Sequence, residues 1–210
     1  YLLGGTFSMS STLALSNADN GESWLGYPGQ TPVLNGNGGV GTAIELTGAA
    51  NNITIARLTI QNYQSTGIAL LFGDMNKIVI DGNTIENIAT PDWNGAGILL
   101  GGTLSDIKVT HNLLRNMDYA GIRGAAADHN VSNILIDSNI ILDVMKRVCD
   151  GGGIQYYHHG SGNGPVTISN NIIGEYGPRG VGDSCRNKAI YLDDGMSNTT
   201  IVNNIVYGTG

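Results

Sequence analysis

The sequence has few charged residues, few prolines and no long apolar run. Charged residues make up 13% of the 210-residue chain, about half the usual globular share. Only five prolines are present and the net charge is −7, while Ile, Val and Leu recur regularly, which argues against a disordered linker. The longest apolar runs, such as 67–72, are too short to cross a bilayer, so we expect no membrane span.

Basic residues are also scarce. Ten Lys and Arg stand against seventeen Asp and Glu, without a basic cluster, which argues against a nucleic-acid partner. Glycine, by contrast, is abundant: its 32 residues are about twice the average share. A weakly charged, glycine-rich chain with 41% apolar residues favours a repetitive β-structure.

One strand-like pattern recurs along the chain. Apolar and polar residues alternate in it with a period of two, which predicts strands, and its central apolar residues are Ile55, Ile80, Val109, Ile136, Ile168 and Ile201. Five copies carry an asparagine three residues later, at Asn83, Asn112, Asn139, Asn171 and Asn204. Asparagine tolerates bends, and its amide can pair with the next copy. The column therefore predicts an asparagine ladder at one bend.

A second strand-like pattern lies between the copies of the first. It begins Gly-Ile at residues 67, 97, 121 and 153, and 189–192 and 43–46 are related to it. Three short strands per repeat predict an all-β parallel β-helix of about six coils, stacked about 4.8 Å apart. We expect residues 1–42 to be an N-terminal β segment, residues 43–210 to form the coils, and the chain to continue beyond residue 210.

The order of strand, Asn bend, strand, variable loop and Gly-Ile strand resembles the right-handed parallel β-helix proteins of the pectate-lyase type, from about residue 33 onward. The resemblance implies a right-handed coil and a carbohydrate polymer or oligosaccharide as the partner. It also implies a secreted or extracytoplasmic location. Segments 150–154 and 190–194 are similar to parts of β-helical glycoside hydrolases.

Long insertions break the repeat beside the Gly-Ile strands, at 89–94, 144–150 and 176–188. Function on a repeat scaffold concentrates where the repeat is broken, so we expect the outward face of these strands to be a cleft floor. Aromatic rings beside polar groups suit a sugar. The residues expected to bind substrate are Arg123, Gln155, Tyr157, His158, Lys188 and Tyr191.

Glycosidic cleavage needs one protonated and one ionised carboxyl group. Asp150 and Asp193 would face each other across the floor strand, with Asp194 as a reserve catalytic residue. A purely turn-forming role for these aspartates is the structural alternative, because Asp-Gly is a strong turn signal. The first hypothesis is therefore a glycoside hydrolase without a cofactor or a metal.

Two other functions stay open. A polysaccharide lyase would use a Lys or Arg base, and calcium held by Asp is possible in that case. A non-catalytic β-helix would bind glycan or space other domains. The adjacent His158 and His159 supply too few ligands for a metal site by themselves.

The two cysteines are predicted to form a disulfide. Cys149 and Cys185 each lie five residues before a Gly-Ile anchor, at Ile154 and Ile190, so they share a column in successive coils. The coil spacing of about 4.8 Å suits a disulfide. Closing a loop of about 37 residues would add roughly 4 kcal/mol. Thiol titration of the unreduced, denatured protein is expected to find no free thiol, and two titratable thiols would contradict the bridge.

Overall fold

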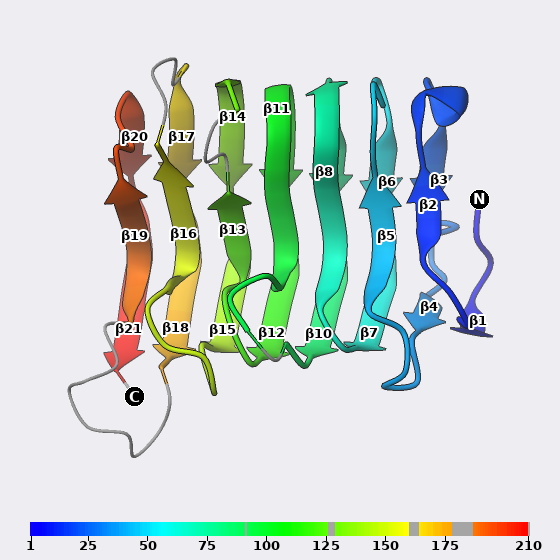
Figure 1. The fold of residues 1–210 in the computed structure, drawn as a ribbon. Coiled ribbons are helices and arrows are strands. Elements are labelled where there is room, and N and C mark those ends of the chain that lie inside the picture. The colour runs from blue at the N-terminus through cyan, green and yellow to red at the C-terminus, as the bar shows by residue number, and fades with distance from the viewer. Residues whose placement is uncertain (91, 126–128, 160–163, 178–186, 210) are drawn as a thin grey trace.

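Parallel pairing between successive coils builds the whole fold. The computed structural model describes residues 1–90, 92–125, 129–159, 164–177 and 187–209. Figure 1 shows the strands standing side by side from the N-terminus (blue) to the C-terminus (red), in two layers. Every strand pair is parallel, as the repeat predicted, and about six coils stack into a right-handed β-helix. Within the described residues the one helix is a short 3₁₀ turn, η1 (Asn17–Asp19).

One layer is an eight-stranded sheet built from the strand that follows the asparagine bend in each coil. Its strands are, in order, β1 (Gly5–Ser8), β4 (Pro32–Asn35), β7 (Thr59–Tyr63), β10 (Thr84–Ile88), β12 (Leu113–Met117), β15 (Ile140–Val144), β18 (Ile172–Tyr176) and β21 (Ile205–Thr209). Parallel pairing thus includes residues before position 43, because β1 pairs with β4 and β4 with β7.

The other layer is a thirteen-stranded sheet that holds both remaining strands of each coil. The Gly-Ile strands and their first relatives are β2 (Leu13–Leu15), β5 (Thr42–Leu46), β8 (Thr66–Asn76), β11 (Ala96–Thr110), β13 (Ile122–Ala125), β16 (Gly152–His158) and β19 (Lys188–Asp194). The strands that lead to the asparagine bend are β3 (Ser23–Leu25), β6 (Thr54–Ala56), β9 (Val79–Asp81), β14 (Val131–Asp137), β17 (Val166–Ser169) and β20 (Thr199–Val202). In one coil both merge into the single strand β11.

The core consists of apolar columns between the two layers. The isoleucines of the Gly-Ile strands, such as Ile68, Ile98 and Ile122, are fully buried, as are Ile85 and Ile141 of the opposite sheet. Burying one such side chain contributes roughly 1.5–3 kcal/mol. Each repeat adds several such contributions. Because the same interior positions must be apolar in every coil, they recur at regular intervals in the sequence.

The glycine of the Gly-Ile motif is required by close approach between the layers. A Cβ at Gly121 or Gly153 would lie 2.6 Å from Cγ2 of Ile141 or Ile173, and the one at Gly121 would lie 2.9 Å from the Gly153 carbonyl oxygen. Contacts under 3.0 Å do not occur for real Cβ atoms. The glycine column lets the core isoleucines of the facing sheet pack against bare backbone.

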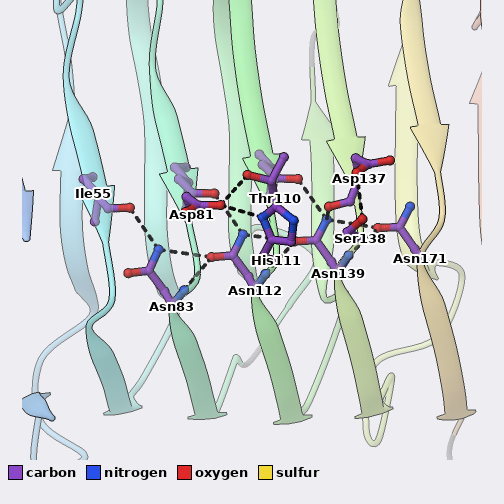
Figure 2. Close-up of polar contacts among 12 residues, drawn as sticks. Ile55, Asp81, Asn83, Thr110, His111, Asn112, Asp137, Ser138, Asn139 and Asn171 are labelled. Atoms are coloured by element: carbon purple, nitrogen blue, oxygen red, sulfur yellow. Dashed lines mark hydrogen bonds and ion pairs between the residues drawn. The ribbon is translucent and has the colours of Figure 1, made fainter. Parts of the chain in front are cut away.

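The predicted asparagine ladder is present, and Figure 2 shows its central members. Each amide nitrogen donates to the Oδ1 of the next asparagine: Asn83 to Asn112 at 3.0 Å, Asn112 to Asn139 at 3.0 Å, and Asn139 to Asn171 at 3.0 Å. The same Oδ1 also accepts the backbone N–H of the preceding asparagine. Asn204 continues the row beyond Asn171. The four asparagines from 83 to 171 are buried.

A second row of polar contacts joins the coils four residues after the ladder. Asn62 donates to Asn35 at 3.0 Å, Asn87 to Asn62 at 3.2 Å, and Asn116 to Asn87, while Lys146 donates to Asn116. Asn62, Asn87 and Asn116 have φ values of 62°, 57° and 58°. Asparagine is among the few residues that adopt this left-handed conformation readily. The row therefore fixes a second bend in each coil.

Beside the ladder, Asp137 accepts three hydrogen bonds on the outer surface (Figure 2 labels Asp137 and Ser138). The donors are the hydroxyls of Ser138 at 2.7 Å and Ser169 at 2.5 Å, and the amide of Asn170 at 2.7 Å. Partial burial raises the pKa of Asp137, but these hydrogen bonds and the nearby His111 outweigh it and hold the pKa below its usual value.

The ladder predicts graded costs for Asn-to-Leu changes. Asn139→Leu removes the acceptor of both the backbone N–H and the side-chain amide of Asn112. Both side chains also donate through their amides, but the Oδ1 of Asn83 accepts only the Leu58 N–H, so Asn83→Leu leaves one donor unpaired instead of two. Each buried donor left unpaired costs about 1–3 kcal/mol, so urea denaturation should show the larger loss of unfolding free energy for Asn139→Leu. Asn130→Leu, at an exposed position, is the control. Equal losses at 139 and 130 would contradict the ladder's role.

Asp137 predicts a pH-dependent contribution to stability. Its folded pKa is lowered, so its stabilisation is present above the unfolded value of about 3.9 and is lost as the pH falls through the folded pKa. Chemical denaturation should find Asp137→Asn less stable than the unmodified protein at pH 5–7, with the difference shrinking below about pH 4. The exposed Asp74→Asn serves as the control. A difference independent of pH would show that the charge of Asp137 is irrelevant.

Candidate functional site

The floor of the site is the outward face of the Gly-Ile strands. Strand register places Arg123 beside Gln155 and Gln155 beside Tyr191, and it pairs Tyr157 with Asp193 in the neighbouring row. Both rows lie on the face of the Gly-Ile strands that the sequence predicts to be the cleft floor. Because adjacent strands lie about 4.8 Å apart, side chains in a row are within reach of one ligand.

Three carboxylates gather at the C-terminal part of this floor. Asp150, Asp193 and Asp194 line one open hollow of about 340 Å³, together with Arg123, Gln155, Tyr157 and other side chains. Asp150 enters from the loop before β16, and the two others end β19. The catalytic candidates of the sequence thus lie around the same cavity as three of the expected substrate-binding residues.

The hydroxyl of Tyr191 reports how closely these carboxylates converge. Burial and a hydrogen bond to Asp193 raise the pKa of Tyr191 to about 12. The negative charges of Asp150 and Asp194 add to this rise. Tyr191 therefore stays protonated and donates a hydrogen bond to Asp193.

Asp193 and Asp194 also shape the turn that ends β19. The backbone N–H of Asp194 donates to Oδ1 of Asp193 at 2.9 Å, and Asp194 has a φ of 51°. The carboxylate of Asp194 pairs with Nε2 of His159 at 2.7 Å. The turn-forming role considered for these residues is thus real, and it coexists with their place in the hollow.

The loop that carries Asp150 is fixed by a buried tyrosine. The Tyr119 hydroxyl lies 2.8 Å from Oε1 of Gln155 and 3.0 Å from the carbonyl oxygen of Asp150. A Cβ at Gly151 would lie 2.7 Å from the Tyr119 ring, so glycine is required where the loop crosses this ring. Burial raises the pKa of Tyr119. This tyrosine therefore positions both the loop and the Gln155 side chain.

Two cations lie over aromatic rings in or beside the hollow. The guanidinium carbon of Arg123 is 5.0 Å from the centroid of the Tyr157 ring, and Nζ of Lys188 is 4.2 Å from that of Tyr191. Such contacts hold a cation in place while its outer face stays able to donate hydrogen bonds. Nε of Arg123 is buried without a hydrogen-bond partner.

The expected role of His158 needs correction. Its side chain is 1% exposed, and Nε2 lies 3.0 Å from the carbonyl oxygen of His129. The strand alternation that turns Tyr157 outward turns His158 inward. His159, one residue later, lines the hollow instead. Cys185 lies outside the described residues, so the disulfide with Cys149 stays a prediction.

Trp93 is the residue that the sequence interpretation missed. It lies in the inserted loop at 89–94, its side chain is 61% exposed, and its indole N–H donates to the carbonyl oxygen of Cys149 at 3.2 Å. It lines the carboxylate hollow and an adjacent hollow of about 360 Å³. One signal was available, since only two tryptophans are present and one lies in a loop that interrupts the repeat.

Metal and membrane features were sought in the same part of the chain. Among the described residues, no group of three or more His, Cys, Asp or Glu side chains is arranged to hold a metal ion. No helix within the described ranges has the length and apolar character to span a bilayer.

A parallel β-solenoid with a polar hollow on the outer face of one sheet is the class that this geometry defines. The family model described as the right handed beta helix region matches residues 42–210. The chain therefore belongs to the right-handed β-helix family. No curated protein matches the chain.

Proposed function

We propose that this protein is a glycoside hydrolase that acts on a polysaccharide or oligosaccharide. The observation that carries the proposal is the convergence of Asp150, Asp193 and Asp194 on one hollow beside Tyr191. A carboxyl pair is what hydrolysis of a glycosidic bond needs. The exposed ring of Trp93 and the half-buried ring of Tyr157 in the same hollow suit the apolar faces of a sugar.

In the proposed mechanism Asp193 is the base or nucleophile. The Tyr191 hydroxyl and the Asp194 N–H both donate to its carboxylate and hold it in place at the hollow. Asp193 would take a proton from water or attack the anomeric carbon directly.

Asp150 is the proposed general acid. Its carboxyl group is exposed and lines the hollow from the loop before β16, whereas Asp193 lines it from β19. Asp150 would donate its proton to the leaving glycosidic oxygen as the C–O bond breaks. Arg123 would orient sugar hydroxyls from the floor, whereas Gln155 is 4% exposed and its Oε1 accepts a hydrogen bond from the Tyr119 hydroxyl, so it supports the floor from below.

A polysaccharide lyase is the second candidate, and the observation in its favour is Arg123. Its guanidinium is held against Tyr157 at the hollow, where it could bind the carboxylate of a uronic acid. β-Elimination by a lyase would leave an unsaturated product that absorbs ultraviolet light. Hydrolysis would release a new reducing end without this absorbance.

We also propose an extracytoplasmic location. A disulfide between Cys149 and Cys185 would persist in an oxidising compartment, and a polymeric glycan is met outside the cell.

Asn substitution tests the carboxyl pair, because Asn keeps the shape of Asp and removes its acid–base chemistry. Asp150→Asn and Asp193→Asn should fold normally and lose at least about a hundredfold in the rate of reducing-end release from a glycan panel. Asp74→Asn, on the exposed part of β8, should retain full activity. Full activity in either folded site variant would remove that residue from the mechanism, and ultraviolet-absorbing products would favour the lyase.

A further inference from the structure

The carboxylate hollow continues into two others along the stacking direction. The adjacent hollow of about 360 Å³ shares Trp93 and Asp150 with it. A third hollow, of about 280 Å³, shares Arg147 with the second and is also lined by Gln64, Thr90 and Asp118. The three hollows are therefore neighbours and are together called the strip, with Trp93 between the carboxylate hollow and the second one.

The strip crosses five successive coils. Gln64 follows β7 at one end, and Asp193 lies in β19 at the other. Four coil-to-coil steps of about 4.8 Å give a length of roughly 19 Å. This is longer than a single sugar ring, so the strip suits a chain of several sugar units.

The charge of the strip is negative. Among the described residues that line the three hollows, five carry carboxylates, namely Asp92, Asp118, Asp150, Asp193 and Asp194. The cationic side chains among these lining residues are Arg123 and Arg147, with His159 beside them, and Lys188 lies over Tyr191 at the edge of the hollow. The carboxylates therefore outnumber the cations. Arg147 is also engaged, since its Nη1 lies 3.6 Å from Oδ2 of Asp118. Such a lining repels a polyanionic chain.

Trp93 is held so that its ring stays available. The hydrogen bond from its indole nitrogen to the Cys149 carbonyl oxygen fixes the polar edge, while most of the side chain remains exposed. A ring anchored at one edge and open on its surface is a suitable stacking platform for the C–H face of a sugar.

We propose that this strip binds an uncharged oligosaccharide, with one sugar unit stacked on Trp93 beside the carboxylates and further units in the hollows bordered by Arg147. The inference rests on the proposed function and deepens it by naming the substrate class. A neutral chain also separates the hydrolase from the lyase, because β-elimination needs a uronic acid. Arg123 could bind one carboxylate, but the excess of aspartates along the strip disfavours a chain that carries a carboxylate on every unit.

Fluorescence can place a ligand on Trp93, because the chain has only one other tryptophan. Trp24 lies in β3, at the N-terminal end of the solenoid, so Trp24→Phe leaves Trp93 as the single reporter. Asp150→Asn in the same protein prevents turnover. The probes are neutral disaccharides and hexasaccharides of xylose, glucose, mannose and fucose, and a hexagalacturonate.

At least one neutral hexasaccharide should change the Trp93 emission, and it should bind more tightly than its disaccharide and than hexagalacturonate. The affinity of the neutral hexasaccharide should vary little with salt concentration, because the ligand carries no charge that salt could screen. In calorimetry, Trp93→Ala should lower the affinity for the hexasaccharide by about tenfold. Arg147→Ala should lower the affinity for the hexasaccharide to that for the disaccharide. The control is Phe72→Ala, since Phe72 is 76% exposed and lines none of the three hollows.

Tightest binding of hexagalacturonate, or no response to any neutral hexasaccharide, would overturn the inference. An unchanged affinity in Trp93→Ala would do the same. Binding of a neutral chain without cleavage by the unmodified protein would overturn the proposed hydrolase and leave the inference standing. Cleavage of glycans at the same rate by Trp93→Ala and by the unmodified protein would support the proposed hydrolase and overturn the inference.

Discussion

Hydrogen bonding from coil to coil at the asparagine bend is the constraint on which the rest of this structure depends. Asn139 is buried, and its amide donates to both neighbouring coils, to the carbonyl oxygen of Val109 and to Oδ1 of Asn171. A shift of one residue would break the ladder and turn every strand's apolar face outward. The ladder therefore fixes the register of both sheets, and through that register it sets which side chains share a row on the cleft floor.

The fold was predictable because each coil repeats the same physical solution. Ile80, Val109 and Ile136 fill one interior column, and the asparagine three residues later marks the bend. Because the repeat sets the register, residues at equal distances from the anchoring isoleucines lie side by side, as Arg123, Gln155 and Tyr191 do. The second polar row at Asn62, Asn87 and Asn116 was equally periodic and was overlooked, because asparagine is common in turns.

The site was less predictable because it lies where the repeat stops. The sequence repeat gives no information on the conformation of an inserted loop, so the hydrogen bond from Trp93 to the Cys149 carbonyl oxygen could not be predicted from it. His158 was misplaced for the opposite reason. Alternation continues through β16 to its last residue and buries this side chain, whereas the sequence interpretation treated it as the start of an exposed loop.

The ladder also has a direction. Each Oδ1 accepts a backbone N–H from the preceding coil, as Asn112 does from Asn83, and this pins every amide in the same orientation. Aligned dipoles in a low-dielectric interior polarise one another. The row is therefore the side-chain counterpart of a helix macrodipole, with its oxygen end toward the N-terminal coils. At that end Leu58 offers Asn83 only its backbone N–H, so the solenoid carries a built-in electrostatic polarity along its axis.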